Sequence, residues 1–316
     1  MDKREIGKSG IKVVPFAFGG NVFGWTIDEP TSFTILDAFV DKGLDFIDTA
    51  DVYSKWVPGN KGGESETIIG NWLKKSGKRD QVIIATKVGK PMGEDKKGLS
   101  KAYITQAVEA SLKRLQTDYI DLYQSHDDDK DTPLLETLET FTDLIKQGKV
   151  RAIGASNYSG ARLKEALQVS KDNGLAVYQC LQPEYNLYER EHYETELEPV
   201  CLENNIGVIN YYSLASGFLT GKYRSEADLS KSPRGQGIKQ YLNDRGFKIL
   251  NALDQIAAEY NTTPASIAIA WVLARPGITA PIASTTSIKQ LDETAKALTI
   301  KLSDDDIKIL NNASSY

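Results

Sequence analysis

Short apolar runs alternate with longer segments of helical period along most of the chain. Eight runs of five to seven residues predict strands, at 15–20, 44–48, 82–88, 119–125, 150–156, 176–182, 206–212 and 278–284. Between and after them, apolar residues recur three and four positions apart, which is typical of amphipathic helices. These helical segments are 31–42, 64–75, 101–115, 133–147, 160–172, 191–204, 245–260 and 287–298. Eight strands that are each followed by a helix predict a (β/α)8 TIM barrel.

A doubly wound open sheet is the alternative fold. Such a sheet usually carries a GxGxxG turn directly after its first strand, and no such turn follows 15–20. At the two ends of the chain, REIGKSGIKVV predicts an N-terminal β-hairpin that caps the barrel, and 302–312 predicts an extra C-terminal helix with Ser303 as its N-cap. Because a barrel uses about 250 residues, we expect residues 1–316 to form a single domain.

The segment 221–244 departs from the repeating pattern. It is polar and contains glycine, so it predicts a long mobile loop. Loops of this length inside compact domains are usually functional or disordered.

Composition and charge exclude several classes of function. With 43 acidic and 38 basic residues the net charge is −5, which disfavours a nucleic-acid partner. No apolar run approaches the roughly 20 residues of a membrane helix, and the first residues lack the apolar core of a signal peptide. Cys180 and Cys201 fit no disulfide or metal spacing, so we expect a cytoplasmic protein. His126 and His192 are the only histidines, so we expect no metal site. The sequence has no heptad repeat, so it predicts no particular oligomeric state.

Polar residues mark the predicted ends of the strands, where a barrel of this kind places its active site. They are Gly20-Asn21, Asp48, Lys87, His126, Ser156-Asn157, Gln182, Tyr211 and Ser284. Each has a structural explanation when taken alone: Asp48 could cap a turn, Lys87 could extend to solvent, and Tyr53 could be a core aromatic residue. A core-only barrel, however, does not need a carboxylate, an ammonium group and an imidazole at one mouth.

Together these side chains suit proton transfer to an oxygen atom. A free tyrosine has a pKa of about 10, and an ammonium group such as Lys87 next to Tyr53 would lower it. Asp48 would keep Lys87 charged, and His126 would orient a bound carbonyl. The set therefore predicts a proton donor to an oxygen that gains negative charge, as in carbonyl reduction. The hydride must then come from a cofactor.

At these residues the sequence resembles the aldo-keto reductase superfamily. The most specific block is FIDTADVYSKWVPGNKGGESETIIGNWL, and IIATKV, DLYQSH, GASN, QPEYNLYER and YYSLASGFLTGKY follow in order. The resemblance matches Asp48, Tyr53, Lys87 and His126 to the family's catalytic tetrad. It implies an NADP-dependent oxidoreductase that reduces aldehydes or ketones to alcohols, with Tyr53 as the general acid.

The resemblance also implies a cofactor site. Ser156, Asn157 and Gln182 would hold the carboxamide and Tyr211 would stack on the nicotinamide. The remaining cofactor residues implied are Asn21, Ser213, Leu214, Gly217, Leu219, Lys222, Ser284, Thr285, Lys289, Gln290 and Thr294.

The region after the eighth strand departs from the pattern of many family members. Those members carry Lys and Arg for the adenosine 2′-phosphate, whereas this chain reads ASTTSIKQLDET, with Lys289 as the nearest cation. Hydroxyl groups bind phosphate with less charge assistance. NADPH is the predicted cofactor, with NADH as the alternative.

Two tryptophans, Trp25 and Trp56, are the predicted substrate walls, because aromatic walls suit apolar carbonyl compounds. The carboxylates at 127–129 beside His126 predict discrimination against strongly anionic substrates.

Two other functions remain open. Because potassium-channel β subunits resemble the same family, one alternative is a regulatory or sensor subunit that binds nicotinamide cofactor with little turnover. The other is a barrel isomerase or hydrolase with Asp48 and His126 as an acid–base pair. The second alternative leaves Tyr53 and Lys87 without a role.

Overall fold

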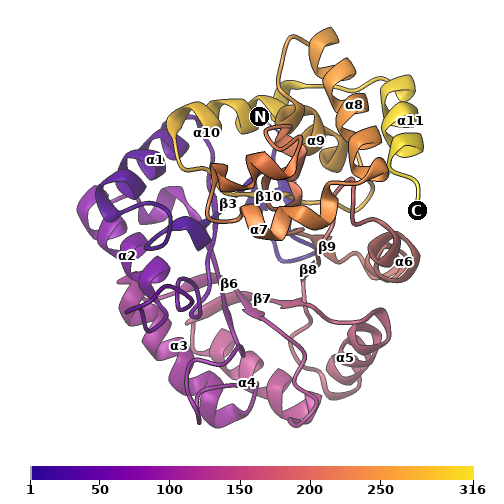
Figure 1. The fold of residues 1–316 in the computed structure, drawn as a ribbon. Coiled ribbons are helices and arrows are strands. Elements are labelled where there is room, and N and C mark those ends of the chain that lie inside the picture. The colour runs from indigo at the N-terminus through magenta and orange to yellow at the C-terminus, as the bar shows by residue number, and fades with distance from the viewer. Residues whose placement is uncertain (1) are drawn as a thin grey trace.

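Eight short parallel strands form the central sheet of the computed structural model, which describes residues 2–316 (Figure 1). They are β3 (Ala17–Gly19), β4 (Phe46–Asp48), β5 (Ile83–Val88), β6 (Ile120–Ser125), β7 (Val150–Ser156), β8 (Cys180–Gln182), β9 (Gly207–Val208) and β10 (Ile282–Ala283). Their order is β10-β3-β4-β5-β6-β7-β8-β9. Val208 closes the circle, because its N–H donates to the Gly277 carbonyl (3.2 Å) and its carbonyl accepts from Thr279 (2.8 Å). The predicted (β/α)8 barrel is confirmed.

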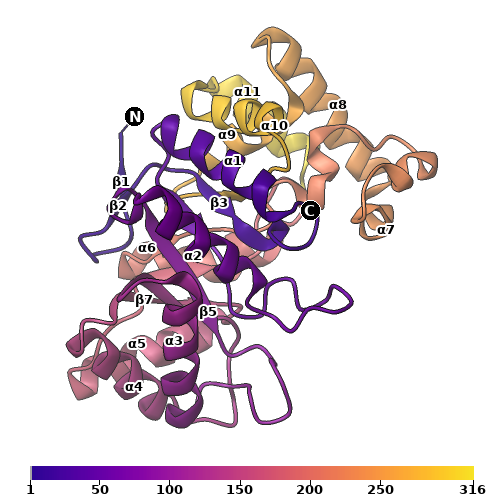
Figure 2. The same ribbon diagram turned by 90° about the vertical axis from the view of Figure 1, so that its left-hand side faces the viewer.

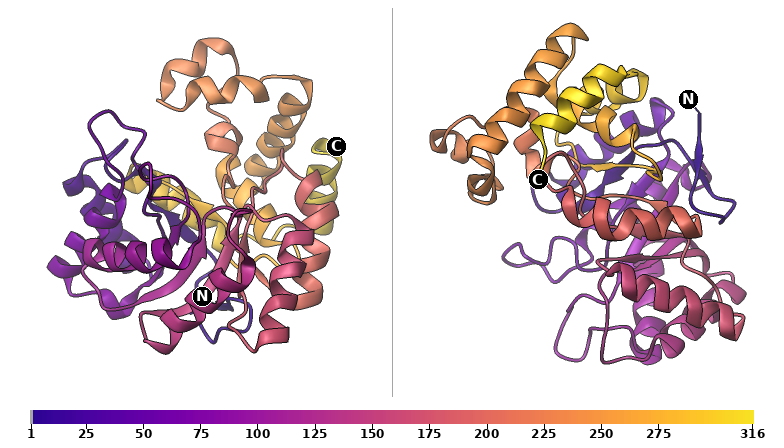
Figure 3. Two further views of the ribbon diagram at one scale, coloured as in Figure 1. Left: turned by 90° about the horizontal axis from the view of Figure 1, so that it is seen from below. Right: turned by 90° about the vertical axis from the view of Figure 1, so that its right-hand side faces the viewer.

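Helices surround the barrel on its outer side, and one short helix, α7 (Gly235–Ile238), lies beside its mouth (Figures 1 and 3). They are α1 (Glu29–Asp41), α2 (Glu64–Ser76), α3 (Lys101–Leu115), α4 (Leu134–Lys146), α5 (Gly160–Asn173), α6 (Glu198–Asn204), α7 (Gly235–Ile238), α8 (Asp244–Glu259), α9 (Pro264–Leu273), α10 (Ile288–Ala295) and α11 (Asp304–Ala313). Side-chain caps set several of the starts: Asp28 accepts from the Thr31 N–H at α1, and Ser100 from the Tyr103 N–H at α3. Ser303 and Asp306 form a complete capping box at the predicted extra helix, α11.

Helix α9 is not predicted by the sequence pattern. Its sequence PASIAIAWVL is apolar on every side, and residues 265–272 are all buried. A helix buried all round has no polar face and therefore no amphipathic period. Thr263 as N-cap and Pro264 in the first turn were the available signals.

The N-terminal hairpin, β1 (Arg4–Glu5) and β2 (Lys12–Val13), is antiparallel and closes the bottom of the barrel. Ile6, Ile11 and Val13 are buried there against the inward-facing apolar residues of the strands. Figure 2 shows this hairpin and α7 at opposite ends of the molecule. The hairpin therefore leaves the other mouth open for a site.

The prediction of a mobile loop at 221–244 is wrong. The segment forms a 3-10 helix at Glu226–Lys231, helix α7 and a further 3-10 turn at Lys239–Tyr241. Leu229, Ile238 and Tyr241 are buried and anchor these turns. The alternation of single apolar anchors with polar residues hid this order, and the segment projects as a folded lobe beside the open mouth (Figures 2 and 3).

No helix within residues 2–316 is both long enough and apolar enough to cross a membrane. In the same part of the chain, no three His, Cys, Asp or Glu side chains are grouped so that they could hold a metal ion.

Candidate active site

A polar layer sits directly above an apolar layer inside the barrel. Successive inward-facing positions of a strand are two residues apart. On strands β4, β5, β6 and β8 the inward residues change from Phe46, Ala85, Leu122 and Cys180 to Asp48, Lys87, Gln124 and Gln182. All four polar side chains are at most 2 % exposed. The alternation that fills the barrel therefore also places its polar groups at the carboxyl ends of the strands.

Above this layer lies a cavity of about 1140 Å³. Ligand pockets usually measure roughly 300–1,000 Å³, so this one has room for a large cofactor and a small substrate. Of the predicted site residues, it is lined by Asn21, Trp25, Asp48, Tyr53, Trp56, His126, Ser156, Asn157, Gln182, Tyr211, Ser213, Leu214, Gly217, Lys222, Ser284, Thr285, Gln290 and Thr294. Lys87 lies directly behind this lining. Residues from all eight strand ends thus meet in one cavity.

Leu219 and Lys289 are placed elsewhere. The Leu219 side chain is fully buried in the core between the strands and the helices. The Lys289 side chain is 87 % exposed and its Nζ lies 3.9 Å from Glu293. Neither side chain lines the cavity.

Lys87 uses all three of its ammonium hydrogens inside the barrel. Its Nζ donates to Asp48 Oδ2 (2.7 Å), to the Thr49 carbonyl (2.8 Å) and to Tyr53 Oη (3.0 Å). Asp48 Oδ1 accepts from the Gln182 amide at 2.8 Å and from the Gln124 amide at 3.4 Å. The Lys87–Asp48 ion pair is therefore fully hydrogen-bonded, as a stable buried pair requires.

The Tyr53 phenol is held in its protonated form. Burial raises its pKa well above the usual value, and the charge and hydrogen bond of Asp48 act in the same direction. Burial also lowers the pKa of Lys87. This differs from the expectation that Lys87 lowers the pKa of Tyr53, because burial and Asp48 dominate. The phenol accepts from Lys87 and donates to Asp48 Oδ2 only at 3.4 Å, a long contact that a closer ligand oxygen would replace.

His126 is neutral in this environment. Burial lowers its pKa well below 6.5, and the charges of Lys87 and Lys90 add to the effect. The ring stands edge to face with Tyr53, with 6.0 Å between centroids. Its Nδ1 is buried without a hydrogen-bond partner, so contact with a bound ligand would be made through Nε2. A neutral imidazole at this place can orient an oxygen but cannot supply a positive charge.

Asn157 and Tyr211 are joined across the mouth. The Tyr211 hydroxyl donates to Asn157 Oδ1 (2.9 Å), and the Asn157 amide donates to the His126 carbonyl (2.9 Å). Nearby, Ser156 Oγ donates to the Gln182 carbonyl (2.8 Å). Together they present a planar ring beside amide and hydroxyl groups, which suits a flat amide-bearing ligand.

A strained turn follows the seventh strand. Ala215 and Ser216 have φ values of 46° and 57°, and Gly217 has a φ of 100°. Left-handed backbone at residues other than glycine costs about 1–3 kcal/mol per residue and is concentrated at ligand sites. Lys222 lies beside this turn, since a Cβ on Gly217 would be 3.7 Å from Lys222 Nζ. The N–H groups of Ala215 and Gly217 donate within the turn, so Lys222 is the group here that suits a phosphate.

Hydroxyl groups line the cavity after β10. Ser284 Oγ donates to Asn21 Oδ1 (2.7 Å), which joins the first and last strand ends. Thr285 Oγ1 is buried without a partner. Gln290 Oε1 accepts from the Thr286 N–H (2.9 Å) at the start of α10. An unpartnered hydroxyl next to a helix N-terminus fits a polar or anionic cofactor group.

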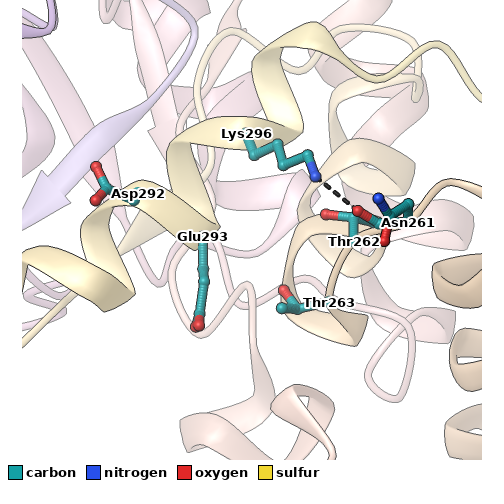
Figure 4. A pocket seen from close by; sticks show the side chains of 6 residues that line it. All are labelled: Asn261, Thr262, Thr263, Asp292, Glu293 and Lys296. Atoms are coloured by element: carbon teal, nitrogen blue, oxygen red, sulfur yellow. Dashed lines mark hydrogen bonds between the residues drawn. The ribbon is translucent and has the colours of Figure 1, made fainter.

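A second, shallower hollow of about 350 Å³ adjoins the cavity at α10 (Figure 4). It is lined by Asn261, Thr262, Thr263, Asp292, Glu293 and Lys296. Lys296 Nζ already donates to the Asn261 carbonyl at 2.7 Å. Thr263 and Glu293 line both spaces, so the hollow is a side extension of the main site.

The carboxylates at 127–129 do not face the cavity. Asp128 accepts from Arg162 Nε (2.8 Å), and Asp129 caps the backbone at Leu99 (2.7 Å). Asp127 Oδ2 lies 3.5 Å from Lys90 Nζ. Lys90 lines the cavity, whereas Asp127 does not. Local hydrogen bonds engage two of the carboxylates and a lysine pairs with the third, so their charges are partly compensated. The discrimination against anions stays a prediction.

Asp51 is a buried carboxyl group that the sequence pattern does not predict. It is 2 % exposed, and neither of its oxygens has a hydrogen-bond partner. Burial, followed by the charge of Glu66, raises its pKa to about 8, and Arg114 and Lys87 oppose this only in part. Tyr103 and Tyr123 are the other titratable groups that face it. The carboxyl is therefore protonated at neutral pH.

Replacement of Asp51 by asparagine should make the protein more stable at pH 8 than the original chain. In the unfolded chain the carboxyl ionises near pH 4, whereas in the folded protein it stays protonated up to about pH 8. The folded state thus binds more protons between these values, and stability falls as the pH rises. The gain from Asp51→Asn should grow from pH 4 to pH 8 and then level off, reaching a few kcal/mol in urea denaturation.

Asp118→Asn is the matched control, because Asp118 is exposed. A stability difference between Asp51→Asn and the original chain that stays constant from pH 5 to pH 8 would contradict the buried protonated carboxyl.

Comparison with known proteins agrees with this architecture. Residues 15–315 match the sequence model of the aldo/keto reductase family. The chain is 37 % identical to the aldo-keto reductase YhdN of Bacillus subtilis over 98 % of its length and 93 % of that protein. It is 34 % identical to a "Probable voltage-gated potassium channel subunit beta" of Arabidopsis thaliana (95 % and 92 % covered). It is 32 % identical to "Aldo-keto reductase yakc [NADP(+)]" of Schizosaccharomyces pombe (98 % and 90 % covered).

Proposed function

The chain belongs to the aldo/keto reductase family, and on that basis we propose that it is an NADPH-dependent oxidoreductase that reduces aldehydes or ketones to alcohols. The observation that carries the proposal is the contact of Lys87 Nζ with Tyr53 Oη at 3.0 Å, at the floor of a large cavity. Bound nicotinamide would supply the hydride, and the protein must then supply the proton.

In this mechanism Tyr53 is the general acid. A carbonyl oxygen placed between Tyr53 and His126 would accept hydrogen bonds from the phenol and from the neutral imidazole. As negative charge develops on that oxygen, the phenol donates its proton. The ammonium group of Lys87, held by Asp48, stabilises the phenolate that remains. In the oxidation direction the same phenolate would act as the base.

The residues around the cavity fit a nicotinamide dinucleotide. Asn157, Gln182 and Tyr211 would hold the nicotinamide end. The amide hydrogens of Gln182 already bond Asp48 and Gln124, which leaves its Oε1 to accept. Ser216, Gly217 and Lys222 would surround the pyrophosphate. Thr285 and the start of α10 would receive the adenosine end.

NADPH should bind more tightly than NADH. A relative that is 32 % identical carries NADP(+) in its name, and Thr285 has an unpartnered hydroxyl for a phosphate oxygen. The preference should be modest, because Lys289 points to solvent and no arginine lies at this end of the cavity lining. Fluorescence titration of both reduced cofactors measures the two Kd values, and equal or tighter binding of NADH would reject NADPH as the preferred cofactor.

A panel of aldehydes and ketones, assayed side by side with NADPH and NADH, tests the proposed activity. Loss of the reduced cofactor's absorbance that depends on the carbonyl compound is the expected result. Tight cofactor binding without turnover of any carbonyl would support the second candidate, a regulatory or sensor subunit. That candidate rests on the 34 % identity to a protein named as a potassium channel subunit. Failure to bind either cofactor would revive an isomerase or hydrolase with Asp48 and His126 as the acid–base pair.

A further inference from the structure

Side-chain hydrogen bonds join the segment 54–60, which follows β4, to the loop that follows β3. The Asn60 amide Nδ2 donates to the Gly24 carbonyl and to the Ser54 carbonyl, both at 3.0 Å. The Ser54 hydroxyl donates to the Phe23 carbonyl at 2.6 Å. Two adjacent carbonyls of the loop after β3 are therefore bound by side chains of the segment 54–60, and the two stretches of chain are held together.

The backbone of this segment turns sharply around Trp56. Ser54 is fully buried and has a φ of 69°, a left-handed conformation that is unfavourable for a residue other than glycine and is concentrated at ligand sites. Turn hydrogen bonds follow from the Val57 N–H to the Ser54 carbonyl (3.1 Å) and from the Asn60 N–H to the Val57 carbonyl (3.0 Å). The side chain of Asn60 closes these turns, because it bonds the Ser54 carbonyl as well.

The position of Trp56 depends on these contacts. Its side chain is 48 % exposed, so burial in the core does not fix it. The ring stands edge to face with Trp25 (5.4 Å between centroids) and with Tyr53 (6.1 Å). Both tryptophans line the cavity. Trp25 directly follows Gly24, the residue whose carbonyl Asn60 binds, so Asn60 links the two stretches of chain that carry the two indole rings.

We propose that Asn60 is a positioning residue that gives the enzyme a preference for flat aromatic carbonyl compounds, because it holds Trp56 against Trp25 before the substrate arrives. A wall that is already ordered binds a flat ring without the entropic cost of ordering mobile side chains. Without Asn60, each aromatic substrate would have to order Trp56 itself. A small aliphatic aldehyde does not cover this wall and should not depend on Asn60. The proposal rests on the proposed reductase function.

The test compares 2-naphthaldehyde with propanal at saturating NADPH. In the original chain the KM should be lower for 2-naphthaldehyde. Asn60→Ala should raise this KM by roughly 5- to 30-fold, as expected when one or two neutral hydrogen bonds are lost. The kcat for both compounds, the KM for propanal and the Kd for NADPH should not change, because only ground-state binding of the ring is affected. An unchanged KM for 2-naphthaldehyde would overturn the proposal.

Asn204→Ala is the matched control. The Asn204 amide also donates to a backbone carbonyl, that of Val200 in α6 (2.9 Å), but Asn204 does not line the cavity. This variant should keep the original KM for both compounds. If Asn60→Ala impaired both compounds equally and also lowered the stability in urea, the proposal would be overturned, since Asn60 would then only support the fold.

A double-mutant cycle shows whether Asn60 acts through Trp56. Trp56→Ala alone should raise the KM for 2-naphthaldehyde, and Asn60→Ala should add little in that background. Fully additive effects would overturn the proposal, because Asn60 would then act on the substrate by another route.

A binding measurement separates this proposal from the proposed function. Calorimetric titration of the NADP⁺-saturated protein with 2-naphthalenemethanol should show binding that Asn60→Ala weakens. If neither aldehyde is reduced but this binding depends on Asn60, the reductase function fails and the positioning role stands. If both aldehydes are reduced and neither the KM nor the binding depends on Asn60, only the positioning role fails.

Discussion

Replacement of Tyr53 by phenylalanine should reduce kcat for carbonyl reduction by roughly 100- to 10,000-fold, the usual contribution of a general acid. The phenol accepts from Lys87 Nζ at 3.0 Å and lines the cavity, and it has a proton to donate. Phenylalanine keeps the ring, and with it the contacts to Trp56 and His126. The hydroxyl group would be lost, and with it the proton that the developing oxyanion needs and the oxygen that accepts from Lys87. Stopped-flow and steady-state measurements with saturating NADPH would quantify the effect.

The Kd for NADPH should remain unchanged in Tyr53→Phe, because the groups proposed to hold the cofactor are on other strands. This control separates a chemical defect from a folding defect. Turnover that remains within a few-fold of the original chain would contradict the role of Tyr53, and would point to His126 as the proton donor. That result would be surprising, because burial holds the pKa of His126 well below 6.5 and keeps the ring neutral.

The barrel and its polar layer could be predicted because both follow from local pattern. Apolar runs that alternate with helical segments specify strand and helix order, and each strand end carries its polar residue in sequence. The step from Phe46 to Asp48 or from Ala85 to Lys87 is visible in the sequence, and the barrel turns it into a shared layer. Lys87, Asp48 and Tyr53 were expected to lie together from the sequence, and in the structure they are in contact.

The protonation of the Tyr53 phenol could not be predicted in the same way. A lysine beside a tyrosine suggests a lowered phenol pKa. The actual pKa of the phenol depends also on burial and on the other acceptors to which Lys87 donates. In the folded protein Asp48 and burial act more strongly, and they raise the pKa of Tyr53. Asp51 illustrates the same limit, since only the packing of α2 and α3 places Glu66 near it and leaves its oxygens unpartnered.

The lobe at 221–244 shows why irregular segments resist prediction. Three buried anchors, Leu229, Ile238 and Tyr241, are too far apart to form a helical or strand period. They nevertheless order the segment and bring Arg234 onto Trp25, a residue that is distant in the sequence. Non-local contacts of this kind leave no local pattern, so most of what this lobe contributes to the cavity lining was not predicted from the sequence.

Replacement of Lys87 by methionine should lower the free energy of unfolding by about 3–5 kcal/mol, because it leaves the buried charge of Asp48 without its partner. Both side chains are at most 1 % exposed, and three hydrogen bonds from Nζ would be lost. Carbonyl reduction should also be lost, since no ammonium group would stabilise the phenolate of Tyr53. Urea denaturation and the aldehyde assay would measure the two effects separately.

The double variant Asp48→Asn with Lys87→Met distinguishes a structural role from a catalytic one. Neutral side chains of similar size can replace a buried ion pair at little cost, so stability should recover by most of the loss while turnover stays absent. The interaction energy from this double-mutant cycle reports the pair itself, because the two residues are in direct contact. If Lys87→Met were as stable as the original chain, the 2.7 Å ion pair would not exist in solution. If the double variant recovered turnover along with stability, Lys87 would act only through folding, and the proton transfer assigned to the Lys87–Tyr53 contact would need a different source.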